Sequence, residues 1–164
     1  MKRRNFLRYS TILAVASPFG LAGVVSAGTV AQGDFEVSYT PDEWRERLDP
    51  AAYDVLREGG TERAFSSPLN DEKRKGVYHC KGCDQAVYSS ETKFDSGTGW
   101  PSFYAAIDNA VATMKDRRLF SVRTEVHCDR CGGHLGHIFD DGPKPTGKRH
   151  CINGVAMTFK PATG

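Results

Sequence analysis

Several features that would point to particular protein classes are missing from this sequence of 164 residues. It contains no internal repeat and no low-complexity segment, apart from a duplicated CxxC motif. It has no concentrated stripe of basic residues, so nucleic acid is not an expected partner. Apolar residues make up 39% and charged residues 26%, as in globular proteins, and the length suits one domain with a core.

The first 27 residues contain no acidic side chain and differ in character from the rest of the chain. Their basic residues precede an apolar stretch over residues 11–25. Residues 3–7 (RRNFL) resemble the twin-arginine export signal, and residues 25–27 (VSA) have the small side chains that signal peptidases prefer. We therefore predict a twin-arginine-like signal peptide over residues 1–27 and export, to the periplasm in a bacterium, with the membrane met only during transport.

An uncleaved membrane anchor is the alternative interpretation of this segment. Polar and helix-breaking residues in and beside the apolar stretch favour cleavage; they are Ser10, Ser17, Pro18, Gly20 and Gly23. Cleavage would remove four of the 22 Lys and Arg residues and none of the 20 Asp and Glu residues, so the formal charge would change from +2 to −2. The net positive charge of the whole chain therefore comes from the predicted signal peptide.

Two short helices are expected near the start of the domain. Thr40 is a favourable N-cap, Pro41 suits the first helical position, and Glu43 completes a capping box. A second helix is expected through residues 51–56, and Gly59-Gly60 would end it because glycine tolerates left-handed backbone angles.

The rest of the chain predicts a mainly β domain over residues 40–161, made of antiparallel sheets. Residues 28–39 have no periodic pattern and are expected to form a flexible lead, and the polar residues 61–76 to form a surface loop. Strand-like segments with β-branched or alternating residues follow, at residues 77–80, 86–88, 120–126 and 155–159.

Four of the five cysteines form two CxxC pairs, each at a predicted strand end: Cys80, Cys83, Cys128 and Cys131. Two such pairs are typical of a zinc knuckle, in which four thiolates close a tetrahedral shell and make the ion structural. A redox CxxC and disulfides within or across the pairs are alternatives, although neither pair lies in the βαβ setting of redox motifs. His79 and His127 each precede a pair, but neighbouring strand residues face opposite sides, so neither is an expected ligand.

The fifth cysteine, Cys151, has no partner in the sequence. On a strand, Arg149 and Asn153 would share its face, where a guanidinium stabilises a thiolate and an amide can bind an oxygen that develops charge. His134 and His137 titrate near neutrality and can deliver a proton. The alternatives are a buried, inert cysteine and two structural histidines; a metal hydrolase would need a third ligand, and none stands out.

Taken together, these residues resemble the methionine-R-sulfoxide reductases, the MsrB family, over nearly all of the chain from about residue 40 to 161. The matching blocks are the two CxxC pairs, residues 96–103 (SGTGWPSF), 123–126 (RTEV), 134–139 (HLGHIF), 141–143 (DGP) and 149–153 (RHCIN).

The resemblance implies a fold of two antiparallel sheets, one structural Zn²⁺ ion away from the active site, and thiol-dependent reduction of the R epimer of methionine sulfoxide in proteins. Cys151 would be the nucleophile that becomes a sulfenic acid, and His134 or His137 the acid. Trp100 would form an apolar wall for the substrate methyl group, while Arg149 and Asn153 would orient and activate the site. We expect a monomer.

Two positions depart from the family pattern. Many members have a resolving cysteine where this chain has Thr98, so a thioredoxin-like protein or a small thiol would have to reduce the sulfenic acid directly. His150 stands where an aromatic residue such as Tyr is usual, and on a strand it would face away from Cys151. A non-catalytic zinc-ribbon binding module and a thiol hydrolase are the competing functional hypotheses.

Overall fold

The structure is a computed structural model that describes residues 30–117 and 122–163. The predicted signal peptide lies outside these residues. Within the described ranges, every helix is too short or too polar to cross a membrane.

Two helices begin the domain, α1 (Pro41–Arg47) and α2 (Pro50–Glu58), and both predictions are confirmed. The Thr40 hydroxyl accepts a hydrogen bond from the backbone of Glu43, whose carboxylate accepts one from the Thr40 N–H at 2.8 Å. Gly59 ends α2 in the left-handed conformation, with a φ angle of 69°. Local capping rules therefore account for the helix ends.

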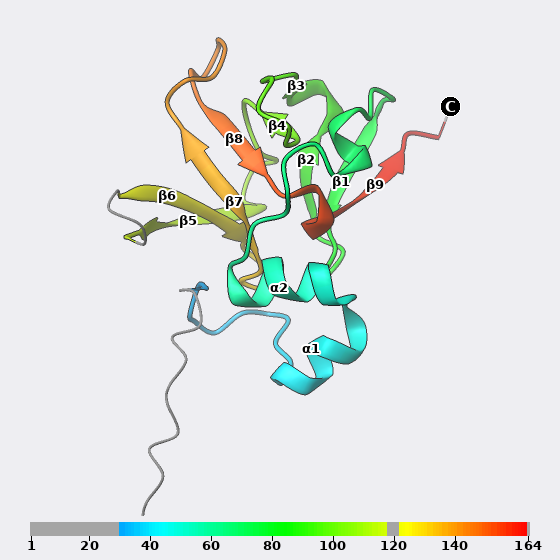
Figure 1. The fold of residues 1–164 in the computed structure, drawn as a ribbon, viewed down its shortest axis with the longest axis vertical. Helices are drawn as coiled ribbons and strands as arrows, with labels where there is room; N and C mark the ends of the chain where they lie inside the picture. The colour runs from blue at the N-terminus through cyan, green and yellow to red at the C-terminus, as the bar shows by residue number, and fades with distance from the viewer. Residues whose placement is uncertain (1–29, 118–121, 164) are drawn as a thin grey trace, which may run out of the picture.

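The strands form two antiparallel sheets, as the sequence predicts (Figure 1). The three-stranded sheet has the order β2-β1-β9 and the six-stranded sheet the order β3-β4-β8-β7-β6-β5. The strands are β1 (Gly76–Cys80), β2 (Ala86–Ser89), β3 (Lys93–Phe94), β4 (Ser102–Phe103), β5 (Val111–Asp116), β6 (Arg123–Cys128), β7 (His134–Phe139), β8 (Arg149–Ile152) and β9 (Met157–Pro161). Three short 3₁₀ helices join them: η1 (Pro68–Asn70), η2 (Ser90–Thr92) and η3 (Gly154–Ala156).

Two predicted strand boundaries are wrong. β9 begins at Met157 rather than Val155, because residues 154–156 turn in η3, where the Ala156 N–H donates to the Asn153 carbonyl at 3.1 Å. In the described part of the predicted strand 120–126, pairing begins only at Arg123 and continues to Cys128. β5 and β7 were not expected, since β5 is mostly half-exposed and β7 contains two histidines and a glycine.

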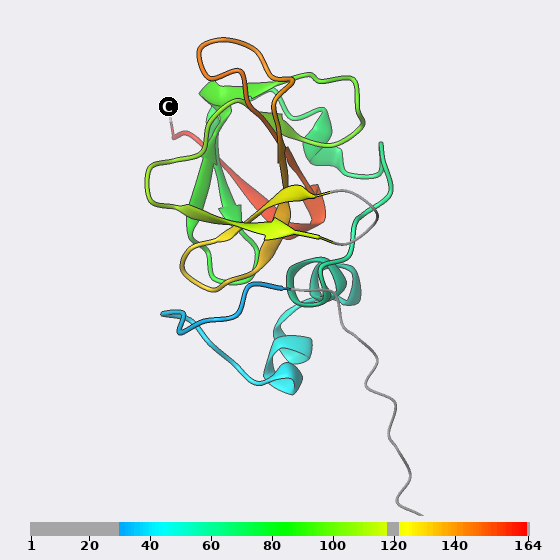
Figure 2. The ribbon, with the colours of Figure 1, turned by 90° about the vertical axis from the view of Figure 1, so that its left-hand side faces the viewer.

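The core lies between the two sheets and is closed at one end by the helices. Tyr88 of the smaller sheet stacks on Phe103 of the larger one at a centroid distance of 4.4 Å, and Tyr78 meets the same ring edge-on at 5.0 Å. All three side chains are fully buried. Both ribbon views place α1 and α2 below the sheets (Figures 1 and 2), and α2 packs against β7 and η3. This shared core fixes the position of one sheet relative to the other.

The described part of the N-terminal lead, residues 30–39, has no helix or strand. It nevertheless contacts the domain, since the Val37 N–H donates to the Arg130 carbonyl at 3.0 Å and Glu36 pairs with the Arg130 guanidinium at 2.7 Å. The flexibility of this lead stays a prediction.

Candidate active site

The four CxxC cysteines come together in one cluster, and their sulfur atoms all lie within 4.8 Å of one another. The sulfurs of Cys80 and Cys131 are 3.7 Å apart, and those of Cys83 and Cys128 are 3.5 Å apart. Zinc–sulfur bonds of about 2.3 Å place the corners of a tetrahedron about 3.8 Å apart. The cluster therefore fits a tetrahedral ion of zinc size and leaves no corner for water.

The backbone supports this cluster at the ends of strands from both sheets. Each pair is followed by a residue with a left-handed backbone, Asp84 at a φ angle of 61° and Gly132 at 67°. The Arg57 guanidinium donates to the Cys131 carbonyl at 2.9 Å, and that of Arg130 to the Cys83 carbonyl at 3.2 Å. An ion here would join β1 of one sheet to β6 of the other and would therefore hold the fold together.

Cys151 lies on β8, in the middle of the larger sheet and away from the cluster. Its neighbours in register are Ser102 on β4 and His137 on β7, and residues opposite one another in antiparallel strands have side chains on the same face. Gly136 permits the close packing of β7 on β8, because a Cβ atom there would lie 2.0 Å from the Cys151 carbonyl oxygen.

The half-buried Cys151 side chain faces a pocket of about 150 Å³. The pocket is lined by Thr61, Trp100, Arg123, Gly136, His137, Phe139, Cys151 and Asn153. None of the clustered cysteines lines it. The pocket thus combines a thiol, an imidazole and aromatic walls, the groups needed for nucleophilic attack on a small, partly apolar substrate.

Comparison with known proteins shows the family to which the chain belongs. Residues 48–161 match the model of the SelR domain. The chain is 53% identical over 130 residues to the peptide methionine sulfoxide reductase MsrB of Pseudomonas putida strain W619, covering 79% of this chain and 98% of the relative. The chain belongs to the MsrB family.

Two further relatives have the same printed name. The MsrB of Methanosarcina barkeri is 54% identical over 125 residues, which cover 76% of this chain and 88% of the relative. The MsrB of Agrobacterium fabrum is 49% identical over 127 residues, which cover 77% and 94%. The likeness extends well beyond the cysteine motifs, over most of both chains.

The thiol of Cys151 lies among opposing electrostatic influences. Burial raises its pKa, while the Arg149 guanidinium and a hydrogen bond with the Thr98 hydroxyl act to lower it. The net direction is upward, because burial is the largest influence. Arg149 is itself held by Asp141, to which its Nε and Nη2 atoms each donate at 2.9 Å. Arg149 therefore favours the thiolate, but burial outweighs it and raises the pKa of the Cys151 thiol above that of an ordinary cysteine.

The two histidines of this MsrB chain lie in different environments. His137 lines the pocket, and its Nε2 atom is 2.8 Å from an Asp116 carboxylate oxygen. His134 is fully buried outside the pocket lining, with Nδ1 2.9 Å from a Glu125 oxygen, and its ring lies edge-on to His137 at 5.3 Å. Burial lowers the pKa of His137 despite Asp116, so this imidazole is neutral at pH 7. The structure thus places His137 at the pocket and His134 outside its lining, a distinction that the sequence did not make.

Trp100 and Asn153 lie at the pocket wall, and Asn153 is placed differently from the prediction. β8 ends at Ile152, so Asn153 is not on the strand with Cys151 but directly before η3. Its amide nitrogen donates to the Leu135 carbonyl at 3.0 Å, and its oxygen accepts from the Glu62 N–H at 3.0 Å. The indole N–H of Trp100 donates to the Glu62 carbonyl at 3.1 Å.

The two family departures have clear structural settings. The Thr98 hydroxyl lies 2.8 Å from that of Ser96, which in turn lies 2.7 Å from that of Ser102, so a chain of hydroxyls joins Thr98 to the register neighbour of Cys151 on β4. His150 packs on Tyr88 on the opposite side of β8, with its Nδ1 atom 3.1 Å from the phenol oxygen. The prediction that His150 faces away from Cys151 is confirmed.

Sequence reasoning missed three residues at the site: Asp116, Arg123 and Glu62. Arg123 lines the pocket and donates to Asp116 at 2.7 Å, and its place in the matched block 123–126 was the available signal. Asp116 ends a strand that was not predicted. Glu62 lies in a segment interpreted as an ordinary surface loop, and nothing in its sequence neighbourhood marks it.

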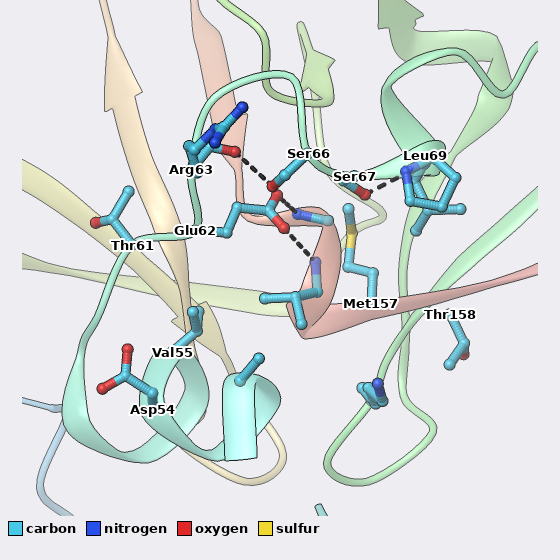
Figure 3. Close-up of a pocket in the computed structure, with 15 residues that line it drawn as sticks. Asp54, Val55, Thr61, Glu62, Arg63, Ser66, Ser67, Leu69, Met157 and Thr158 are labelled. Carbon is cyan, nitrogen blue, oxygen red and sulfur yellow. Dashed lines mark hydrogen bonds between the residues drawn. The ribbon is translucent and has the colours of Figure 1, made fainter. Parts of the chain in front are cut away.

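A larger cavity of about 670 Å³ adjoins this site between α2, η3 and the segment that follows α2 (Figure 3). Thr61 lines both cavities. No cysteine or histidine lines the larger one, so the smaller pocket, which has the thiol, is the candidate active site.

Proposed function

We propose that this protein reduces the R epimer of methionine sulfoxide in proteins to methionine, with Cys151 as the nucleophile. The observation that carries the proposal is the pocket in which Cys151 is flanked by His137 and walled by Trp100. Family membership supports the reaction class, because the relatives are named peptide methionine sulfoxide reductases.

In the proposed reaction, the Cys151 sulfur attacks the sulfoxide sulfur while the sulfoxide oxygen is protonated. Cys151 and His137 are both uncharged at rest, so the thiol can supply the proton and the imidazole can pass it to the oxygen. The attack forms a sulfur–sulfur bond and leaves a hydroxyl on the substrate sulfur. This hydroxyl then passes to the Cys151 sulfur as the substrate's sulfur–oxygen bond and the sulfur–sulfur bond break, so methionine leaves with the electron pair and Cys151 holds the oxygen as a sulfenic acid. His134 lies edge-on to the His137 ring and outside the pocket lining, so it is given a supporting role.

Selectivity for the R epimer requires the pocket to distinguish the substituents of a chiral sulfur. The apolar face of Trp100 suits the methyl group, and His137 suits the oxygen, whereas the thiol must approach from a third direction. Exchanging methyl and oxygen, as in the S epimer, would place a polar atom against the indole and leave the imidazole facing a methyl group.

Regeneration of Cys151 is proposed to use an external thiol. Four of the five cysteines are in the cluster, and Thr98 provides a hydroxyl rather than a thiol beside Cys151. Two equivalents of a small thiol, or one dithiol protein of the thioredoxin type, would reduce the sulfenic acid to the thiol, releasing water and a disulfide. The substrate partners would be oxidised proteins.

The metal identity and the cellular location are part of the same proposal. Cys80, Cys83, Cys128 and Cys131 would hold one Zn²⁺, which supplies structural cross-linking and no chemistry at the pocket. Residues 1–27 would direct export of a monomeric enzyme. A non-catalytic zinc module would also use the cluster, but it gives no role to the thiol pocket.

The proposal is tested with a blocked methionine sulfoxide resolved into its two epimers and dithiothreitol as reductant. We expect turnover of the R epimer and none of the S epimer, with one zinc bound per chain. The absence of turnover, or equal turnover of both epimers, would reject it. Metal without turnover would favour the binding module.

A further inference from the structure

Glu62, in the segment between α2 and η1, forms hydrogen bonds through every polar group it has. Its N–H donates to the Asn153 side-chain oxygen at 3.0 Å, and its carbonyl accepts from the Trp100 indole at 3.1 Å. Its carboxylate accepts from the backbone amides of Gly154 and Val155, the latter at 3.0 Å (Figure 3). One residue thus contacts two pocket walls and the turn that follows Cys151.

We propose that Glu62 is a positioning residue that fixes Trp100 and Asn153 around the Cys151 pocket, an inference that rests on the proposed function for the identity of the substrate. The backbone of Glu62 holds the two side chains, and its carboxylate holds that backbone in place. Trp100 and Asn153 come from segments more than 50 residues apart, and Glu62 is bonded to both. Removing the carboxylate would therefore disturb the two walls together.

The carboxylate is suited to this anchoring role. It is half-buried, and burial raises the pKa of Glu62, whereas the two amide bonds act in the opposite direction. Gly154 makes room for this contact, since a Cβ atom at that position would lie 1.9 Å from the Ser67 hydroxyl and 3.3 Å from a Glu62 carboxylate oxygen. The two amides therefore replace the water that burial removes from the charged group.

A second set of contacts connects the same segment to the loop that contains Trp100. The Phe65 N–H donates to the Gly99 carbonyl at 2.7 Å, and Phe65 has a φ angle of 63°, which is unfavourable for a bulky residue. The Phe65 ring covers Gly99, where a Cβ atom would lie 2.7 Å from it. The surroundings thus keep Phe65 in a strained backbone conformation, and the Trp100 loop is held at two points.

The test compares Glu62→Ala and Glu62→Gln with the unaltered protein. For Glu62→Ala we expect KM for the R sulfoxide to rise about tenfold or more with a change in kcat of less than about threefold, because wall positions control binding more than bond breaking. Glu62→Gln keeps an oxygen that can accept an amide hydrogen, so it should recover part of the KM. Glu46→Ala, an exposed glutamate on α1, is the control for loss of charge and should leave both constants unchanged.

Acrylamide quenching of tryptophan fluorescence supplies a readout that does not depend on activity. The chain has two tryptophans, and Trp44 is only 2% exposed, so quenching reports mainly Trp100. We expect stronger quenching in Glu62→Ala than in Glu62→Gln, measured at a temperature at which all the proteins are folded. The same variants in a Trp44→Phe background confirm that the signal comes from Trp100. Equal quenching and equal KM in all three proteins would overturn the inference. If the unaltered protein has no reductase activity, the proposed function fails, while the quenching still decides the role of Glu62.

Discussion

The four-cysteine cluster and the Cys151 pocket are built in different ways. In the cluster, four thiols from two short motifs face one another, and turns after each motif complete the enclosure. In the pocket, a single thiol in mid-strand is surrounded by groups from the segment after α2, the Trp100 loop, β6 and β7. A closed structural site can thus be built from local repeats, whereas a reactive site needs an open side and contributions from distant segments.

The largest expected effect is the loss of activity when the pocket thiol is removed and the cysteine cluster is left intact. Cys151→Ser should lower turnover of the R sulfoxide by at least about a thousandfold, because a serine hydroxyl is a far weaker nucleophile than a thiolate. Its zinc content and melting temperature should match those of the unaltered protein. Metal analysis and thermal unfolding measure these controls, and residual turnover near the original rate would place the nucleophile elsewhere.

The reciprocal change breaks the cluster. Cys128→Ala removes one of four sulfurs, so we expect loss of the bound metal and a melting temperature lower by well over about 10 °C, since metal binding and folding are coupled. Activity should fall in proportion to the folded fraction. A variant that keeps its stability without metal would refute a structural role for the ion.

The third prediction distinguishes the role of His137, which lines the pocket, from that of His134. His137→Asn should lower kcat about a hundredfold, because it removes the group placed to transfer the proton. His134→Asn removes the partner of the buried Glu125 carboxylate, so it should mainly lower the free energy of unfolding. Steady-state kinetics and urea unfolding of both variants measure this difference. A larger loss of kcat in His134→Asn would reverse the assignment.

The contrast between the regions also explains what the sequence could predict. The capping box at Thr40, the glycine end of α2 and the cysteine pairs are local signals, and each prediction matches the structure. The separate environments of His134 and His137 depend on Asp116 and Glu125, which lie on other strands. Sequence spacing alone could not show which imidazole faces the thiol.

The segment after α2 is a second case in which the sequence could not show a tertiary contact. Its polar composition predicts a surface loop over residues 61–76, and none of residues 61–75 is buried, although the segment contains η1 and its last residue, Gly76, begins β1. Glu62 is nevertheless half-buried and bonded to residues that follow it by 38 and 91 positions. Composition describes the average exposure of a segment, whereas a single anchoring side chain is set by tertiary contacts.

A smaller effect concerns the ionisation of Cys151. Alkylation of this thiol by iodoacetamide should increase with pH, with an apparent pKa above that of an ordinary cysteine, because burial is the largest influence. Thr98→Val removes a hydroxyl that favours the thiolate, so it should raise that pKa further, while Thr98→Ser should retain it. Mass spectrometry of the zinc-loaded protein follows the reaction at Cys151. An unchanged profile in Thr98→Val would exclude a role for the hydroxyl.

The smallest effect concerns His150, which lies on the far side of β8 from Cys151. Burial lowers its pKa from 6.5 to about 4, so the unfolded chain binds the proton more readily than the folded protein. The free energy of unfolding should therefore decrease as the pH falls from 6.5 to about 4, and this contribution should not change further below that range. Urea unfolding across this pH range measures the slope.

His150→Phe removes the titrating group, so the part of the slope that depends on His150 should be absent in the variant and present in the unaltered protein. The variant also leaves the buried Tyr88 hydroxyl without its imidazole partner, which adds a penalty that does not vary with pH in this range. Tyr88→Phe retains His150 and should therefore keep the slope. The difference between its free energy of unfolding and that of the unaltered protein measures the contribution of the Tyr88 hydroxyl, which does not depend on pH in this range. Equal slopes in His150→Phe and the unaltered protein would mean that another group, outside this face of β8, causes the acid sensitivity.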